Sequence, residues 1–192
     1  AVRRAQKVLV TTEFTKQDAI QYAGVEVNRI AKVPMLAPDF SKVEPEIVST
    51  PDHPYFLWTT NAGAHKNHEN ALKALKFYYE TLGGQFFCHV TGVNTENLLE
   101  RGLPHLKSLS TLVGTSAALK EKVKWLGELP DFEYRCALAN ATFLWHAGKI
   151  DNGTFSVVEA ASLGVPALSS NYPAMHEMDV QFSLQLSWMN AA

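Results

Sequence analysis

Short apolar runs alternate along the chain with longer segments whose apolar residues recur every three or four positions. From residue 55 onward, short segments rich in apolar residues occupy positions 55–60, 85–92, 123–127, 142–147 and 166–170, and the apolar run is continuous in the first of them. Segments of this length and composition are typical of buried strands in a parallel sheet. The pattern therefore predicts five strands in this part of the chain, each separated from the next by a helix.

The segments between these runs carry the spacing of amphipathic helices. Residues 65–84 give the clearest example, because their apolar side chains fall on one helical face and Gly83 and Gly84 follow as a stop signal. That face consists of Ala71, Leu72, Leu75, Tyr78, Tyr79 and Leu82. Further helices are expected in pieces over 96–122, over 131–141, and from about residue 153 to Gly164.

The two ends of the chain have patterns of their own. Residues 7–12, 13–24 and 29–36 predict a strand, a helix and a second short strand. Residues 37–54 contain four prolines and scattered acids, which is typical of a linker or an exposed loop. Residues 184–192 carry the start of another helical pattern, so we expect a fragment of a longer protein.

Strands that alternate with helices indicate an α/β fold. The expected architecture is a Rossmann-like, doubly wound parallel sheet with helices on both faces, which is an α/β/α sandwich. Such a sheet binds ligands at the carboxyl ends of its strands. The residues of interest therefore follow the strands: Asn61, His65 and Lys66, then Gly92, then Gly127, and finally residues 146–156.

Composition narrows the class of protein. The 192 residues are 46% hydrophobic and 19% charged, which is typical of a globular protein. The net charge of -2 offers no basic face for nucleic acid, and no apolar run approaches the roughly 20 residues of a membrane span. Cys88 and Cys136 lie in apolar contexts and read as buried thiols of a reducing compartment. We expect a cytoplasmic protein, with the inner face of the membrane as an alternative location for the full-length protein.

Two carboxylates, Asp151 and Glu159, flank the first turns of a helix that otherwise looks buried. Asn152, Gly153 and Thr154 would form its amino-terminal turn, where unpaired N–H groups attract phosphate or sugar oxygens. A lone buried carboxylate needs a partner, and a vicinal diol can donate two hydrogen bonds to one. The spacing is compatible with a nucleotide-sugar. It is equally compatible with a structural arrangement, in which Asp151 caps the helix and Glu159 pairs with a Lys or Arg.

Residues 151–177 resemble the signature of the family-4 retaining glycosyltransferases, which are GT-B enzymes built from two facing Rossmann-like domains. That signature has an acid, seven residues, a Glu and a helix end of small residues. A Gly-x-Pro and a short strand follow, and then a loop with a Pro and a final Glu. In this chain the matching residues are Asp151, Glu159, Gly164, Pro166, Pro173 and Glu177.

Other segments resemble the same family. Lys66-Asn67 is similar to the Lys-Asn pair that begins the first helix of the donor-binding domain. Residues 123–144 resemble the segment whose loop accepts the nucleobase, and residues 8–20 and 29–40 resemble the last elements of the other domain. The resemblance implies that residues 1–50 are a remnant of the N-terminal domain with the interdomain linker. Residues 51–192 would be the donor-binding domain, truncated at its C-terminus.

The resemblance also implies roles for individual residues. Glu159 would hold the ribose hydroxyls, and Asp151 would contact the transferred sugar. The backbone amides of Asn152, Gly153, Thr154 and Phe155 would lie near the sugar and diphosphate. Lys66 would neutralise the diphosphate as it leaves, so Lys66 and Asp151 are the expected catalytic residues. Asn61, His65, Gly92 and Gly127 complete the expected donor site.

The implied reaction moves a hexose from a nucleotide-sugar to a saccharide or lipid-linked acceptor with retention of configuration. Our working hypothesis for the sugar is mannose from GDP-mannose, used in the synthesis of a surface polysaccharide or glycolipid such as lipopolysaccharide. The acceptor would bind to the N-terminal domain, which this chain lacks, so the chain alone should be inactive. GT-B enzymes generally work without a bound metal, so we expect neither metal nor cofactor.

Two departures from the family pattern leave alternatives open. Asn61 stands where the family usually has Arg, and the first acid is Asp rather than Glu. The chain could therefore belong to another GT-B enzyme, such as a sugar-nucleotide epimerase or a phosphorylase, or to a degenerate binding module. His65 and His68 have a spacing that could share a metal, but no third ligand is evident. Glu177 could contact the donor or could act as a helix cap or ion-pair partner.

Overall fold

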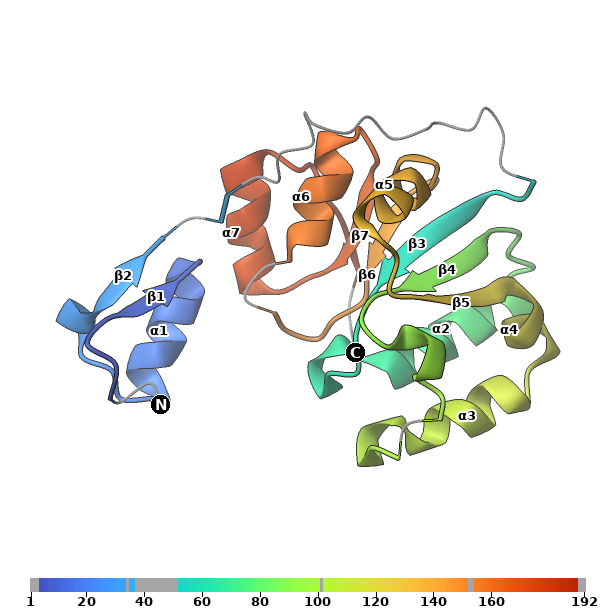
Figure 1. Cartoon of the computed structure of the whole chain (residues 1–192), viewed down its shortest axis with the longest axis horizontal. Coiled ribbons are helices and arrows are strands. Elements are labelled where there is room, and N and C mark those ends of the chain that lie inside the picture. The colour runs from blue at the N-terminus through green and yellow to red at the C-terminus, as the bar shows by residue number, and fades with distance from the viewer. Residues whose placement is uncertain (1–3, 34, 37–51, 101, 152–153, 190–192) are drawn as a thin grey trace.

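The computed structural model describes residues 4–33, 35–36, 52–100, 102–151 and 154–189. They form a small N-terminal βαβ unit and a larger α/β body (Figure 1). In the small unit, strand β1 (Val8–Val10) leads into helix α1 (Glu13–Gln21) and then into strand β2 (Ile30–Lys32). This strand–helix–strand order is the one predicted from the sequence, and β1 and β2 pair in parallel.

The larger body contains a sheet of six parallel strands in the order β5-β4-β3-β6-β7-β8. Their bounds are Tyr55–Thr59 for β3, Phe87–Thr91 for β4, Val123–Gly127 for β5, Leu144–His146 for β6, Ala167–Ser170 for β7 and Ser187–Met189 for β8. The chain winds outward from β3 to β5 and then returns to β6 on the other side of β3. β3 and β6 thus form the switch point, where a doubly wound sheet opens a crevice at its carboxyl edge.

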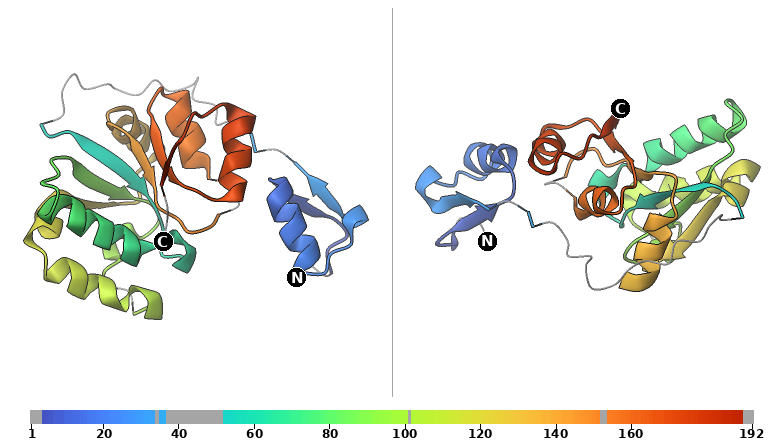
Figure 2. Two further views of the ribbon diagram at one scale, coloured as in Figure 1. Left: turned by 180° about the vertical axis from the view of Figure 1, so that it is seen from behind. Right: turned by 90° about the horizontal axis from the view of Figure 1, so that it is seen from above.

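Helices cover both faces of this sheet (Figures 1 and 2). The buried residues divide into two large clusters because successive strand side chains point to opposite faces: Phe56 and Trp58 face one cluster, and Tyr55 and Leu57 face the other. The first cluster is completed by α2 (His68–Glu80), α3 (Lys107–Gly114) and α4 (Ala117–Lys122); the second by α5 (Asp131–Ala139), α6 (Phe155–Ser162) and α7 (Pro173–Phe182). Short 3-10 turns occupy Val27–Arg29, Ala64–Lys66, Thr95–Asn97 and Pro104–Leu106. The predicted α/β/α sandwich is confirmed.

Two expectations about the last part of the chain are wrong. Where a helical pattern is expected over 184–192, Ser187–Met189 form a strand, β8, whose backbone pairs with the open edge of β7, and residues 190–192 lie outside the described residues. The gain from completing edge hydrogen bonds outweighs a weak local helical preference. The segment around Pro173 and Glu177, expected to be a loop, is helix α7. Pro173 lies in its first turn, where a missing N–H costs nothing.

Most of the expected linker, residues 37–51, lies outside the described residues. The division of the chain at residue 50 therefore stays a prediction. None of the helices in the described part of the chain is both long and apolar enough to cross a membrane.

Candidate functional site

The carboxyl ends of β3 and β6 bring Lys66 and Asp151 together. Lys66 ends the 3-10 turn Ala64–Lys66 after β3, and Asp151 lies in the loop after β6. The Lys66 ammonium nitrogen donates to Oδ2 of Asp151 at 2.6 Å. The two side chains are only 13% and 20% exposed, so their charges interact in a partly shielded environment. Two of the predicted site residues therefore form one ion pair.

The two loops that carry this ion pair are also joined through their backbones. The amide of Lys149 donates to the carbonyl oxygen of His65 at 2.8 Å. Asn67 adopts a left-handed conformation with φ 61°, which turns the chain out of the Ala64–Lys66 turn and into helix α2. Asparagine tolerates this conformation better than most residues. The local backbone thus fixes where Lys66 enters the crevice.

A buried histidine–tyrosine pair lies near the same charges. Nε2 of His146, at the end of β6, is 3.0 Å from the hydroxyl of Tyr172, and both residues are buried. Burial lowers the pKa of His146 to about 4, with Lys66 adding to the effect and Asp151 opposing it. Burial and the charge of Asp151 raise the pKa of Tyr172. Near neutral pH both rings are therefore uncharged.

Glu159 lies on α6 with a partner on the neighbouring helix. The hydroxyl of Tyr134 donates to Oε2 of Glu159 at 2.6 Å. Burial raises the pKa of Glu159, whereas the Tyr134 hydrogen bond and the charge of Arg135 act to lower it. A hydroxyl donor and the positive charge of Arg135 thus both act on this carboxylate within the protein, and the binding of a ribose diol by Glu159 stays a prediction.

A cavity of about 220 Å³ opens at the carboxyl ends of β3, β4 and β5. It is lined by Thr59, Thr60, Thr91, Gly92, Val93, Glu128, Leu129 and Tyr134. Its hydroxyl and carboxylate groups can exchange hydrogen bonds with a polar ligand. Tyr134 belongs both to this lining and to the contact with Glu159, so one side chain connects the cavity with helix α6.

Gly92 and Gly127, two of the predicted donor-site residues, have a clear structural reason to be glycine. Gly92 has φ +133°, and a Cβ there would lie 1.9 Å from the carbonyl oxygen of Thr60. Gly127 has φ +75°, and its carbonyl oxygen accepts a hydrogen bond from the amide of Gly92 at 3.0 Å. Close approach to the backbone of Thr60 therefore accounts for Gly92, and the left-handed backbone accounts for Gly127, while a role of either in donor binding stays a prediction.

The remaining predicted residues lie around these groups. Oδ1 of the exposed Asn61 accepts a hydrogen bond from the amide of Gly63 at 2.9 Å and closes a turn, and His65 is exposed beside it. Thr154, rather than Asp151, is the N-cap residue of α6, and its hydroxyl lies 3.0 Å from that of Ser156. Phe155 is half-exposed. Asn152 and Gly153 lie outside the described residues.

His68 belongs to the core rather than to a metal site with His65. Its Nε2 is 3.0 Å from the hydroxyl of Thr60, and burial lowers its pKa to about 4. Its ring also packs against Trp58, with 5.8 Å between the ring centroids. In the described part of the chain, no group of three or more His, Cys, Asp or Glu residues is arranged to hold a metal ion.

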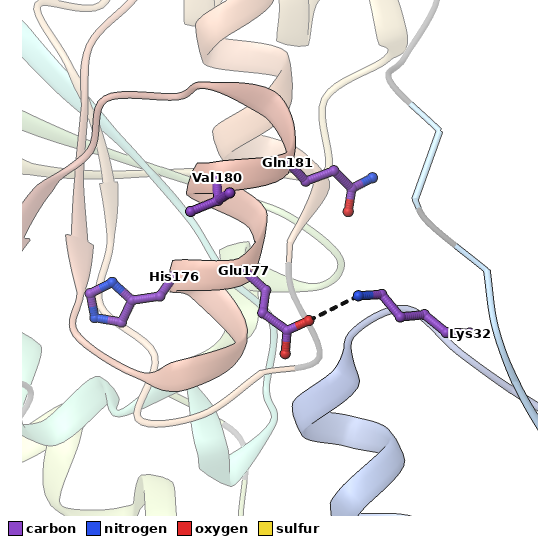
Figure 3. Close-up of a pocket in the computed structure, with 5 residues that line it drawn as sticks. All are labelled: Lys32, His176, Glu177, Val180 and Gln181. Carbon is purple, nitrogen blue, oxygen red and sulfur yellow. Dashed lines mark hydrogen bonds and ion pairs between the residues drawn. The ribbon is translucent and has the colours of Figure 1, made fainter.

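Glu177 caps a helix and forms an ion pair. Its two carboxylate oxygens accept hydrogen bonds from the amides of Glu13 and Phe14, each at 2.7 Å, in the first turn of α1. Lys32 adds an ion pair at 3.3 Å (Figure 3). Lys32 and Glu177 border a cavity of about 580 Å³ whose lining also includes His176, Val180 and Gln181. Glu177 thus ties the N-terminal unit to α7.

Sequence reasoning missed two side chains of this region, Tyr134 and Tyr172. His146, at the end of β6, falls within the singled-out residues 146–156, but the pattern does not predict its pairing with Tyr172. Tyr134 occupies an ordinary position in a predicted helix, and Tyr172 precedes a segment expected to be a loop. Their contacts join elements distant in sequence, so no local spacing reveals them.

Comparison with protein families matches residues 39–181 to the family described as "Glycosyl transferases group 1". A comparison with curated proteins finds no match. Among solved structures, a glycosyltransferase from Rickettsia africae ESF-5 is similar with a TM-score of 0.70 and 14% identity, over 96% of this chain and 49% of that one. A sucrose-phosphate synthase from Thermosynechococcus elongatus gives a TM-score of 0.73 and 15% identity, over 99% and 46%.

WaaG, a glycosyltransferase involved in lipopolysaccharide biosynthesis, is also similar. Its TM-score is 0.64 at 14% identity, with 96% of this chain and 49% of WaaG covered. The present chain therefore spans about half the length of these proteins. At such low identity the likeness shows the fold alone, which is that of a GT-B glycosyltransferase domain.

Proposed function

Because the chain belongs to the glycosyl transferases of group 1, we propose that residues 51–192 bind the nucleotide-sugar donor of a retaining hexosyltransferase. The observation that carries the proposal is the meeting of Lys66 and Asp151 at the switch point of the sheet. A cation and a carboxylate placed side by side suit a donor that carries an anionic diphosphate next to the hydroxyls of a sugar. The narrower assignment to family 4 and the retention of configuration are part of this proposal.

Lys66 acts on the diphosphate. Its positive charge lies where negative charge grows as the bond to the sugar breaks, and a charge fixed in advance stabilises that transition state without reorganisation. Asp151 accepts hydrogen bonds from hydroxyls of the transferred sugar. The two groups form an ion pair with each other, so the diphosphate competes with Asp151 for Lys66.

Glu159 accepts the two ribose hydroxyls of the donor. The nucleobase lies near the loop after β5, beside the cavity that Glu128, Leu129 and Tyr134 help to line. The N–H groups at the start of α6 then lie toward the diphosphate and the sugar, where the partial positive charge of a helix N-terminus favours anions. The donor would thus extend along one edge of the sheet.

The proposed reaction forms a bond between an acceptor hydroxyl oxygen and the anomeric carbon. The bond from that carbon to the diphosphate oxygen breaks with its electron pair, and a phosphate oxygen takes the hydroxyl proton. The acceptor is a saccharide or a lipid-linked sugar, and it binds to an N-terminal domain of which residues 1–50 are the remnant. The 192-residue chain alone binds the donor without transferring its sugar.

Isothermal titration of the chain with UDP, GDP, ADP and GDP-mannose tests this function. We expect at least one nucleoside diphosphate to bind, and Glu159→Ala to lose at least tenfold in affinity, which corresponds to roughly 1.4 kcal/mol. Glu133→Ala is the matched control because it removes an exposed carboxylate on α5, the helix beside Glu159. The proposal is wrong if none of these compounds binds at millimolar concentration, or if both variants bind as the unaltered chain does.

A further inference from the structure

Tyr134 lies between two parts of the proposed donor site. Its side chain lines the cavity at the ends of β3, β4 and β5, and its hydroxyl reaches Oε2 of Glu159 on α6. Glu159 itself is not part of the cavity lining. A ligand that enters the cavity therefore meets Tyr134 beside the carboxylate that this tyrosine holds.

The position of Tyr134 is fixed by its helix. Its amide donates to the carbonyl oxygen of Pro130 at 2.8 Å, in the first turn of α5. Farther along the same helix, the hydroxyl of Tyr55 donates to the carbonyl oxygen of Ala137 at 2.7 Å and anchors α5 to β3. Leu138, also on α5, is fully buried in the core. The Tyr134 hydroxyl is thus presented by a helix tied to the sheet and is not free to follow Glu159.

We propose that Tyr134 is a positioning residue, which orients the carboxylate of Glu159 toward the ribose diol of a nucleotide. This inference rests on the function proposed above. It adds that recognition of the ribose depends on a side chain of α5, which neither the composition of the chain nor the spacing of its acids identifies. Tyr134 itself would act through Glu159 and would not bond to the ribose.

The hydrogen-bonding capacity of a carboxylate allows this arrangement. Two carboxylate oxygens offer about four lone-pair sites, and the tyrosine hydroxyl uses one of them. Enough sites remain for two hydroxyls of a vicinal diol. The bond from Tyr134 also limits rotation of the carboxylate, which reduces the ordering cost of binding the diol.

The same bond favours the ionised carboxylate. Burial raises the pKa of Glu159, and the Tyr134 hydroxyl counters this effect by donating to the charged form. The other charges that act on Glu159 also come from α5: Arg135 favours ionisation and Asp131 opposes it. Loss of the hydroxyl would therefore raise the pKa of Glu159 further and leave less of the ionised acceptor.

The matched pair Tyr134→Phe and Tyr55→Phe tests the proposal. Each variant removes one tyrosine hydroxyl that makes a hydrogen bond. The Tyr134 hydroxyl, which belongs to α5, donates to Glu159, whereas the Tyr55 hydroxyl donates to the backbone of α5. Titrations use the nucleoside diphosphate that binds best, its 2′-deoxy form, and inorganic pyrophosphate. The ribonucleotide reports on the whole site, the deoxy form lacks one diol hydroxyl, and pyrophosphate reports on the Lys66 end alone.

We expect Tyr134→Phe to weaken the ribonucleotide roughly three- to tenfold, the range of a single hydrogen bond. It should weaken the 2′-deoxy form less and leave pyrophosphate unchanged, so that discrimination between the two sugars falls. The loss for the ribonucleotide should grow from pH 8 to pH 5.5, because the variant's Glu159 protonates at higher pH. Tyr55→Phe should show none of these changes.

Two results would overturn the proposal while leaving the donor-binding function intact. One is a Tyr134→Phe variant that binds all three ligands as the unaltered chain does. The other is an equal loss for all three ligands, which would mean that the hydroxyl only joins α5 to α6. If the unaltered chain binds no nucleoside diphosphate, the function proposed above fails first, and this inference fails with it.

Discussion

The ammonium nitrogen of Lys66 lies 2.6 Å from Oδ2 of Asp151, across 85 positions of sequence. The two residues come from loops after β3 and β6, which are adjacent strands at the switch point. Both charged groups are mostly covered by protein, so each strongly affects what the other can bind. This ion pair makes the binding of an anion at Lys66 a competition with a resident carboxylate.

Removal of the Asp151 carboxylate and removal of the Lys66 ammonium group should therefore have opposite effects on diphosphate binding. We expect Asp151→Asn to bind nucleoside diphosphates and pyrophosphate at least as tightly as the unaltered chain, because Lys66 no longer has a competing carboxylate. Lys66→Met should lose at least tenfold in affinity. Isothermal titration at low ionic strength measures both effects, since salt screens charges at partly exposed sites.

Lys73→Met is the control for this pair, because Lys73 is an exposed lysine on α2 that pairs with Glu69. It should leave the affinity unchanged. An Asp151→Asn variant that binds diphosphate as poorly as Lys66→Met would contradict the competition, and would mean that the carboxylate is needed to hold the lysine in place.

Gly92 and Gly127 offer a second comparison, in which stability is measured. Gly92→Ala would place a Cβ 1.9 Å from a backbone oxygen of Thr60, at φ +133°, so strand ends must separate. We expect a loss of about 3 kcal/mol or more in the free energy of unfolding. Gly127→Ala meets only the flexible side chain of Glu96, at 2.9 Å, and should cost about 1–2 kcal/mol.

Urea denaturation followed by circular dichroism measures these two losses. Gly114→Ala is the reference variant, because a Cβ at this glycine at the end of α3 has nothing within 4 Å and its φ needs no left-handed conformation. Equal losses for Gly92→Ala and Gly127→Ala would show that the strand ends relax more readily than their geometry indicates.

The sequence predicts the sheet well, because short apolar segments recur along the chain and the helical spacing between them is regular. All five expected strands of the larger body are present, and successive residues such as Leu57 and Trp58 enter opposite cores. The sixth strand, β8, was missed because its three residues pair at an open edge and need no strong local pattern. Its existence depends on β7, which a local reading does not include.

The site was predictable only in part, for a similar reason. Lys66 and Asp151 follow neighbouring strands, so the rule for strand ends places them together. Tyr134 reaches Glu159 from another helix, and no spacing within the chain predicts that contact. Glu177 shows the limit most clearly, because its partners are backbone amides of α1, about 160 residues earlier in the chain, as the separations of 164 and 163 show.

The cap that Glu177 provides leads to a third prediction. Glu177→Ala removes two hydrogen bonds to the first turn of α1 and the ion pair with Lys32, and should cost about 1–2 kcal/mol. Glu177→Gln keeps one oxygen acceptor and should cost less. Val180→Ala, an exposed change on the same helix, is the control. In urea denaturation at pH 7, Glu177→Ala should lose the most free energy of unfolding, Glu177→Gln should lose less, and Val180→Ala should lose least.

The contribution of Glu177 to the stability of the protein should also depend on pH. Partial burial acts to raise the pKa of Glu177, but the amides of Glu13 and Phe14 and the charge of Lys32 hold it below the ordinary value of 4.5. A carboxylate whose pKa is lowered by folding stabilises the protein above the unfolded pKa, and that stabilisation is lost as pH falls through the folded value. The stability difference between the unaltered chain and Glu177→Gln should therefore shrink below pH 4.5. A difference that stays constant down to pH 3 would contradict an ionic contribution.

His68 leads to a prediction about the stability of the protein in mildly acidic solution, between pH 7 and pH 5. Burial lowers its pKa to about 4, below the ordinary value of 6.5, so the folded protein resists protonation there while the unfolded chain accepts the proton. Stability is thus complete above pH 6.5 and falls as pH drops toward 4, by about 1.4 kcal/mol per pH unit for one such histidine. His146, with a pKa also lowered to about 4, adds a similar loss.

We expect His68→Gln, which can keep the bond to the Thr60 hydroxyl, to flatten the decrease in melting temperature between pH 7 and pH 5. The exposed His53→Gln should leave the curve unchanged, and equal slopes for all three proteins would contradict the prediction.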